Sequence, residues 1–189
     1  MDAQIRAREA VDQSDDLTPE EERELGRLLD KVAARVRRGV KFPIPEAAYE
    51  PLHRVVPYPA IDQVIVDDRG RVLMVLRDDK YFKGWELVGG YGHWPESLSD
   101  WCNRLALRDV GATVELRGFT GIHKWMPGEH AHGAPISMVS LSRLTSPPTR
   151  KDVEMAFFER APRDTVPNHA RFVDITIEAM QTGEIIKPL

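Results

Sequence analysis

Apolar and polar residues alternate along the chain in segments whose periods predict a mixed α/β protein. Residues 60–66 and 71–76 are rich in β-branched side chains, and the Asp-Asp-Arg-Gly between them has the composition of a tight turn, so a β-hairpin is predicted here. Further strands are predicted at 113–124, 135–143 and 153–158, and a last helix at 167–181 that ends at Gly183. This pattern indicates one domain of the α/β or α+β class.

A separate helix is predicted near the N-terminus. Thr18-Pro19-Glu20-Glu21 forms a capping box with proline at the first helical position, and apolar residues then recur at helical spacing as far as Val36. The helix should run from 19 to 38. Its apolar stripe must be covered by the main domain or by a second copy of the chain, and we favour a homodimer through this helix.

Prolines punctuate the segment from 42 to 59, which predicts an irregular linker that packs on the domain surface. The expected organisation is therefore a helical extension and proline-rich linker over 1–57, followed by one domain over 58–189.

The amino-acid composition excludes several classes of binding partner and several types of structure. The 189 residues contain 26 Lys and Arg against 30 Asp and Glu, and this net charge of -4 argues against a nucleic-acid polymer as partner. The single cysteine excludes an internal disulfide. No signal peptide and no apolar run near the roughly 18 residues of a membrane span are present, so a cytoplasmic protein without membrane contact is expected.

The most specific motif lies between Gly89 and Ala112. It reads Gly90, five residues, Glu96, seven residues, Arg104 and then a run that ends Asp-Val-Gly-Ala, and it follows the sequence KGWELVGG. This spacing resembles the Nudix box of the Nudix hydrolase family. The resemblance covers roughly 58–182 and implies an α/β/α sandwich with a mixed sheet, and it implies a nucleotide-type small molecule as substrate.

The motif keeps its spacing but changes its charge. The three glutamates that follow the arginine in the usual box are Leu105, Arg108 and Asp109 here, which raises the local charge by three units. Hard cations need clustered oxygen ligands, so at most one Mg²⁺ or Mn²⁺ is expected, held by Asp109 and the carbonyl of Gly89 as the resemblance implies. Alternatively, the helix simply presents a core stripe that ends at Leu105, with residues 108 and 109 on the surface.

Arg108 is the most informative of these positions, because a guanidinium grips phosphate with two parallel hydrogen bonds and can neutralise a diphosphate in place of a metal ion. We expect Arg108, Arg104 and Arg77 to hold a diphosphate. Arginine cannot activate water as a metal does, so hydrolysis would need a general base. Glu96 and Arg104 match two positions that support each other in the usual box. Glu96 is also a candidate catalytic residue.

The segment NRLALRDVGA is similar to the box of the GDP-mannose mannosyl hydrolase branch, which cleaves at the sugar carbon. That branch takes a metal ligand and a base from a later loop. The corresponding positions here are Lys151 and Asp152, so both identities differ, and Asp152 is a candidate base.

Other candidates flank the motif. In extended chain His130 and His132 point to the same side, where they would act as a base, metal ligands or substrate contacts; the alternative is a solvated loop. Tyr91 follows the glycine pair and would stack on a base or sugar, or else pack against the helix.

Together these patterns predict a hydrolase of a nucleoside diphosphate (NDP) sugar or a related NDP-linked small molecule, with weakened metal dependence. The alternative is a catalytically silent module of the same fold that binds a nucleotide or a protein partner. Ordinary multi-metal pyrophosphate hydrolysis ranks third, because two of the three carboxylates are missing.

Overall fold

The computed structural model describes residues 17–38, 45–79, 82–93, 95–126, 128–130 and 133–188. It divides the chain into two compact units, Met1–Pro45 and Glu46–Leu189. None of the helices in these described segments combines the length and the apolar composition of a membrane span.

The first unit contains helix α2 (Pro19–Arg37), and the predicted capping box is present. The Thr18 backbone N–H donates to the Glu21 carboxylate at 2.8 Å, and the Glu21 N–H donates back to the Thr18 hydroxyl at 3.3 Å. Leu25, Leu28 and Leu29 are each 46% exposed, so the described residues of this unit leave the apolar stripe open. Homodimer formation through this stripe remains a prediction.

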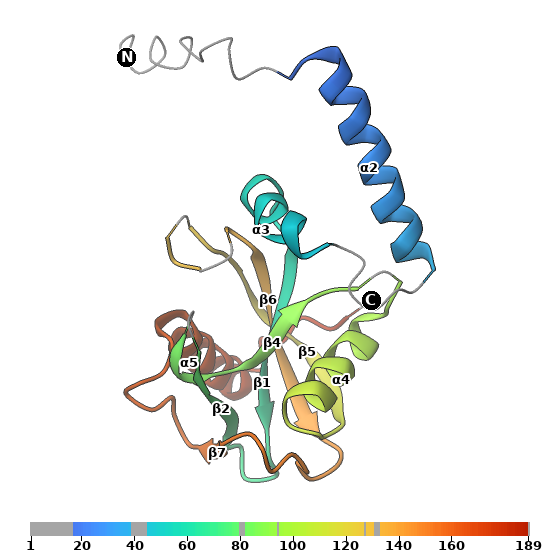
Figure 1. Cartoon of the computed structure of the whole chain (residues 1–189). Helices are drawn as coiled ribbons and strands as arrows, with labels where there is room; N and C mark the ends of the chain where they lie inside the picture. Colours follow the sequence, from blue (N-terminus) through green and yellow to red (C-terminus); the bar gives the residue numbers. More distant parts are fainter. Residues whose placement is uncertain are drawn as a thin grey trace, which may run out of the picture. The chain divides into compact units, whose positions relative to one another are not determined.

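The second unit follows the predicted order of elements (Figure 1). The turn after residue 66 and the helix end at Gly183 are confirmed, and Ser97 caps the start of the helix that follows the glycine pair. Its elements are α3 (Glu46–Val55), β1 (Pro59–Val66), β2 (Val72–Asp78), β3 (Lys83–Glu86), β4 (Val88–Tyr91), α4 (Leu98–Asp109), β5 (Val114–Lys124), β6 (Ile136–Leu144), β7 (Met155–Phe158) and α5 (Pro167–Thr182).

Helix α3 corrects one expectation, that the prolines of 42–59 exclude regular structure. The helix contains Pro51. Pro51 is the sixth of the ten residues and has no N–H, so it removes one backbone hydrogen bond from the middle of this helix, and the helix forms in spite of that loss. The segment therefore contributes a helix to the second unit, with consequences for the site described below.

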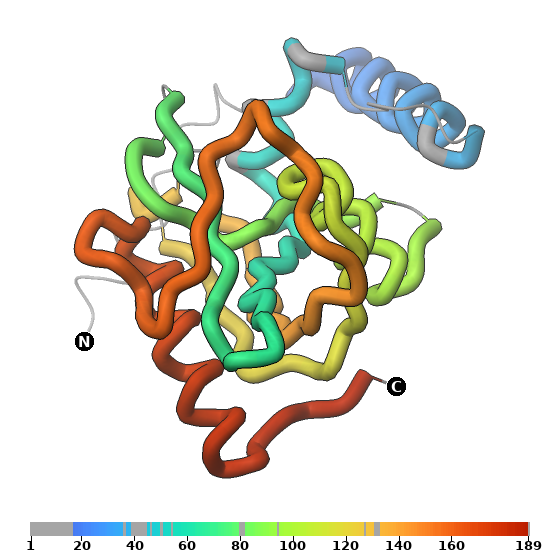
Figure 2. The backbone as a smooth tube through the Cα atoms, turned by 90° about the horizontal axis from the view of Figure 1, so that it is seen from below, coloured from blue at the N-terminus to red at the C-terminus, as the bar shows by residue number. Residues whose placement is uncertain are grey.

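The described strands form one seven-stranded mixed sheet in the order β3-β2-β1-β6-β5, with β4 paired to β1 and β7 paired to β2. β1 and β6 are parallel over eight residue pairs, whereas the other pairs are antiparallel. Figure 2 shows the segment that carries β7, in orange, lying beside β2.

Alternation along β1 divides the core between two helices. Ile61 and Ile65 belong to the apolar cluster that includes Leu105 of α4, whereas Val64 belongs to the cluster that includes Phe172 of α5. Because successive strand residues point to opposite faces, α4 and α5 cover opposite sides of the sheet (Figure 1). The predicted α/β/α sandwich with a mixed sheet is confirmed.

A change of partner along one edge of β1 creates the space for a site. Residues 60–63 of β1 pair with β4, whereas residues 65 and 66 pair with β2. The chain passes from β3, which pairs with β2, to β4 through Leu87 alone. β4 therefore diverges from the β2–β3 hairpin, and a cleft lies between them.

Leu105 tests how strongly the α4 face supports the fold. It is fully buried, so we expect Leu105→Ala to lower the free energy of unfolding by about 2–5 kcal/mol, the usual range for a leucine removed from a packed core. Leu107→Ala on the same helix is the matched control; Leu107 is 52% exposed and should change stability by less than about 1 kcal/mol. Urea denaturation measures both, and equal losses would contradict this packing.

Candidate functional site

The cleft has a volume of about 430 Å³ and is lined by residues that lie far apart in the sequence. Strands β1 to β4 supply most of its floor, and the C-terminal end of α4 closes one side. Tyr49 of α3 and His169 of α5 also line it. Its acidic and basic side chains are Asp62, Arg77, Glu86, Arg108, Asp109, His130 and His169.

Two glycines allow the cleft walls to approach one another. A Cβ atom on Gly89 would lie 2.5 Å from Asp62 Oδ1 of the neighbouring strand. Gly90 has a φ of +150°, and a Cβ atom there would lie 3.1 Å from Leu105 Cδ2 and 3.2 Å from Arg108 Nη1. Only glycine permits these contacts, so the pair brings β4 close to both β1 and α4.

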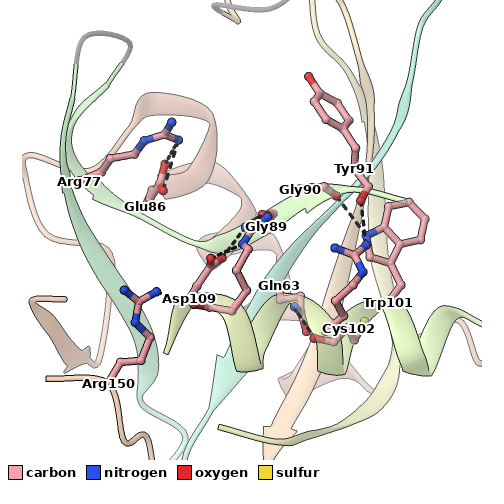
Figure 3. A network of polar contacts seen from close by, with 12 residues as sticks. Gln63, Arg77, Glu86, Gly89, Gly90, Tyr91, Trp101, Cys102, Asp109 and Arg150 are labelled. Carbon is pink, nitrogen blue, oxygen red and sulfur yellow. Dashed lines mark hydrogen bonds and ion pairs between the residues drawn. The ribbon is translucent and has the colours of Figure 1, made fainter. Parts of the chain in front are cut away.

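The Arg108 guanidinium joins the end of α4 to the glycine pair. Its Nη2 donates to the Gly89 carbonyl at 2.7 Å and to Asp109 Oδ2 at 2.7 Å, while its Nε donates to Asp109 Oδ1. Figure 3 shows Asp109 and Gly89 on either side of these contacts. The Arg108 side chain is 53% exposed and that of Asp109 22%, so the ion pair forms part of the accessible cleft wall.

This arrangement bears on the expected metal site. Asp109 and the Gly89 carbonyl, the two proposed ligands, both accept hydrogen bonds from Arg108. Leu105 is buried in the core, and no group of three His, Cys, Asp or Glu side chains suited to a metal occurs among the described residues. Mg²⁺ is usually held by one or two carboxylates together with waters and substrate phosphates, so an ion at Asp109 and the Gly89 carbonyl would have to displace the Arg108 guanidinium, and the metal site remains a prediction.

A second ion pair lies on the opposite wall. Arg77 Nη1 is 3.2 Å from Glu86 Oε2, Arg77 Nε contacts Asp79, and the guanidinium lies 5.1 Å from the centre of the Phe82 ring. Burial raises the pKa of Glu86 to about 7, although Arg77 opposes the shift. Glu86 thus exchanges a proton near neutral pH, which suits a general base or acid.

Asp62 and His169 form a buried pair at the base of the cleft. The Leu87 N–H donates to His169 Nδ1 at 3.1 Å, so the neutral ring carries its proton on Nε2, which lies 3.6 Å from Asp62 Oδ1. Burial lowers the pKa of His169, although Asp62 opposes this shift. Asp62 Oδ2 is buried and has no hydrogen-bond partner among the described residues.

Arg104 and Glu96 lie outside the cavity lining and brace the loop before α4. Arg104 donates to both Glu96 oxygens, at 2.7 and 2.8 Å, and to the Tyr91 carbonyl at 2.9 Å. Although burial opposes ionisation, hydrogen bonds from Arg104 and from the His93 backbone lower the pKa of Glu96. Arg108 and Arg77 line the cleft, whereas Arg104, which was expected to hold a diphosphate together with them, does not.

Of the remaining predicted site residues, some line the cleft and others do not. Asp152 lies outside the cavity lining, is 69% exposed and pairs with Arg150, whose hydrogen bond lowers the pKa of Asp152. Arg150 in turn donates to the Arg108 carbonyl at the end of α4. His130 and Tyr91 do line the cleft, whereas His132 lies outside the described residues.

Sequence reasoning missed Asp62, Glu86, His169 and Tyr49 as residues of one cleft. A charged residue inside the apolar run AIDQVIV was a usable signal for Asp62. Glu86 lies three residues before Gly89 in the segment KGWELVGG, and nothing in that segment marks it as a cleft residue. Tyr49 and His169 carried no local signal, because only the tertiary structure brings α3 and α5 to the cleft.

Comparison with known proteins identifies the fold. No protein-family model matches the chain, and no curated protein matches it. Among solved structures, a Nudix hydrolase from Nitrosomonas europaea superposes with a TM-score of 0.57 at 19% identity, over 72% of this chain and 79% of that one. An ADP-ribose pyrophosphatase from Streptococcus suis gives 0.53 at 21% identity, over 67% and 93%.

A UDP-X diphosphatase gives a TM-score of 0.55 at 13% identity and covers 91% of this chain and 87% of its own. The identity is low in all three cases, so these likenesses bear on the fold alone. The chain therefore has the fold of the Nudix hydrolases, and the segment that resembles their box includes helix α4, which packs on the glycine pair.

The Arg104–Glu96 brace gives a prediction with a defined pH window. Glu96→Gln should lower the free energy of unfolding by about 1–2 kcal/mol at pH 7, because it replaces a partly buried bidentate ion pair. The folded pKa of Glu96 lies below its ordinary value of 4.5, so this stabilisation is full above that value and is lost as pH falls through the folded pKa.

Thermal and urea unfolding between pH 3 and 8 measure the difference. Glu115→Gln is the control, since its partner Arg117 and Glu115 itself are both largely exposed. A difference between wild type and Glu96→Gln that is the same at pH 3 and pH 7 would contradict the brace.

Proposed function

We propose that the chain hydrolyses an NDP-sugar or a related NDP-linked small molecule in this cleft, with little dependence on a divalent metal ion. The observation that carries the proposal is the Arg108 guanidinium held between Asp109 and the Gly89 carbonyl on the wall of the cleft. A fixed positive charge stands there next to the backbone of the glycine pair, where it can receive a phosphate oxygen.

Two arginines from opposite walls would hold the diphosphate. Arg108 is 53% exposed and Arg77 35% exposed, so both guanidinium groups are accessible to a ligand. Each already contacts a carboxylate, which fixes its position and keeps the cleft close to electrically balanced. A phosphate would therefore share or displace these carboxylates.

Glu86 is the general base that the geometry favours. It lines the cleft, and with a pKa of about 7 it is ionised above neutral pH. The similarity of the box to the GDP-mannose mannosyl hydrolase branch supports attack at the sugar carbon. In that reaction a water oxygen bonds to the anomeric carbon, the bond from that carbon to the phosphate oxygen breaks, the NDP leaves, and the water proton passes to Glu86.

A second candidate is a silent module that binds the nucleotide without cleaving it. The observation in its favour is that the two cleft arginines are neutralised by carboxylates while two of the three box glutamates are absent. Binding of NDP-sugars without product formation at any pH from 6 to 9, with or without Mn²⁺, would establish it over hydrolysis.

One prediction of this proposal concerns the Arg108 guanidinium and the dependence of activity on a metal ion. Arg108→Met should weaken GDP and UDP binding roughly ten- to hundredfold, because a charged hydrogen-bond donor to phosphate is lost. Isothermal titration calorimetry measures this. Chelation with EDTA should change wild-type affinity and NDP-sugar turnover by less than about twofold, because in this proposal the Arg108 guanidinium neutralises the phosphates in place of a divalent ion.

Arg143→Met is the matched control, since Arg143 is an exposed arginine that pairs with Asp68 away from the cleft. A strict Mg²⁺ requirement for turnover, or full affinity in Arg108→Met, would refute the proposed use of the guanidinium.

The second prediction concerns Glu86. The rate constant kcat/KM should fall tenfold per pH unit below about pH 7 and level off above it, because the base must be ionised. Glu86→Gln should remove this limb and lower kcat by roughly 10²–10⁴-fold.

Asp79→Asn is the control, because Asp79 also contacts Arg77 but does not line the cleft. It should keep the pH limb. If Glu86→Gln keeps the limb as well, Glu86 is not the base.

A further inference from the structure

We infer that His169 is a positioning residue: its ring accepts a hydrogen bond from the Leu87 N–H and thereby fixes the backbone that carries Glu86. The inference rests on the proposed function, because it concerns the group proposed there as the general base. It assigns to His169 the task of holding that group in place, without any contact between the imidazole and the ligand.

The backbone between β3 and β4 needs an acceptor from elsewhere in the fold. Leu87 is the single residue between the two strands, and β3 pairs with β2 whereas β4 pairs with β1. Leu87 is 1% exposed, so water does not supply a partner for its N–H. A buried N–H without an acceptor is strongly disfavoured, and here the acceptor is His169 Nδ1 at 3.1 Å.

The segment that leads into α5 holds the other side of Glu86. The Trp85 N–H donates to the Asp164 carbonyl at 3.1 Å, and the Trp85 carbonyl accepts from the Val166 N–H at 3.0 Å. His169 follows in the first turn of α5. The residues directly before and directly after Glu86 are therefore both bonded to one continuous stretch of chain, and the position of Glu86 depends on that stretch.

The surroundings of the His169 ring suit it to accept this bond. The residue is 7% exposed, and its Nε2 lies 3.6 Å from Asp62 Oδ1. Burial lowers the pKa of His169, so the ring is neutral at neutral pH. A neutral ring with its proton on the side of Asp62 presents the Nδ1 lone pair to Leu87, whereas a protonated ring has no such lone pair. The contact is thus present in the pH range in which Glu86 is ionised.

A change at residue 169 would reach the chemistry through the position of Glu86 alone. The charged groups that act on the Glu86 carboxylate are Arg77 of β2, Asp109 of α4 and Asp62 of β1, and Figure 3 shows the carboxylate facing Arg77. None of them belongs to α5. A base displaced by about 1 Å from its working geometry can cost roughly a hundredfold in rate, so the hold on Leu87 matters for turnover.

Steady-state kinetics on the full chain with NDP-sugars test this role. His169→Leu removes the acceptor and should lower kcat roughly ten- to hundredfold, because Glu86 loses its fixed position. KM and the affinity for GDP should change by less than about threefold, because the phosphate contacts of Arg108 do not involve α5. His169→Asn places an oxygen close to the position of Nδ1 and should return kcat to within about threefold of the wild-type value.

NMR titration of the Glu86 carboxyl carbon gives a second readout that does not need turnover. Burial is the main cause of the raised pKa of about 7, so a loosened backbone that admits water should lower the midpoint by about one pH unit or more in His169→Leu. His169→Asn should keep the wild-type midpoint. If wild type cleaves no NDP-sugar, the proposed function fails, and this titration still decides whether His169 positions Glu86.

Thr176→Val is the matched control. Thr176 is fully buried on the same helix and bonds to Thr120 at 2.7 Å, but it does not line the cleft. The substitution should lower thermal stability without changing kcat or the midpoint of Glu86. If His169→Leu does not fold, His169→Gln replaces it, because its acceptor extends beyond the position of Nδ1. Unchanged kcat and midpoint without the acceptor, or equal defects with and without it, would overturn the inference.

Discussion

The close approach of β4 to α4 is the constraint on which the rest of the site depends. Gly89 and Gly90 leave no room for side chains, so the strand lies against Asp62 on one side and against Leu105 and Arg108 on the other. The carbonyl of Gly89 is thereby brought within hydrogen-bond distance of a guanidinium from the last turn of the helix. A bulkier residue at either position would separate the cleft walls and break this contact.

The cleft shows how a fold can keep its geometry while the electrostatics change. Carboxylates still line it, but each cation they face is a side chain of the same protein. Arg104 and Glu96 make the bracing contact that the family resemblance implies, whereas Leu105 and Arg108 stand at two positions where that resemblance implies carboxylates. Leu105 belongs to the apolar core and Arg108 to the cleft wall. Scaffold and chemistry thus depend on different residues of one helix.

Much of the fold could be predicted from the sequence, because it is encoded locally. The hairpin after Ala60 and the left-handed Gly183 are each specified by a few neighbouring residues. The placement of Arg108 beside the glycine pair also followed from the spacing of the box. Helix α3 was missed because its prolines were weighed without the tertiary contacts that hold it. The convergence of Asp62, Glu86 and His169 could not be predicted, because it arises where β1 changes partners and α5 covers the sheet.

The burial of Cys102 has a practical consequence. Its thiol lies on the buried face of α4, and burial raises its pKa to about 11, so little thiolate exists at neutral pH. The chain has no other cysteine and should resist alkylating reagents and air oxidation while folded. A cysteine introduced at the rim of the cleft would then be the one reactive thiol, to which a fluorophore or spin label can be attached to follow ligand entry directly.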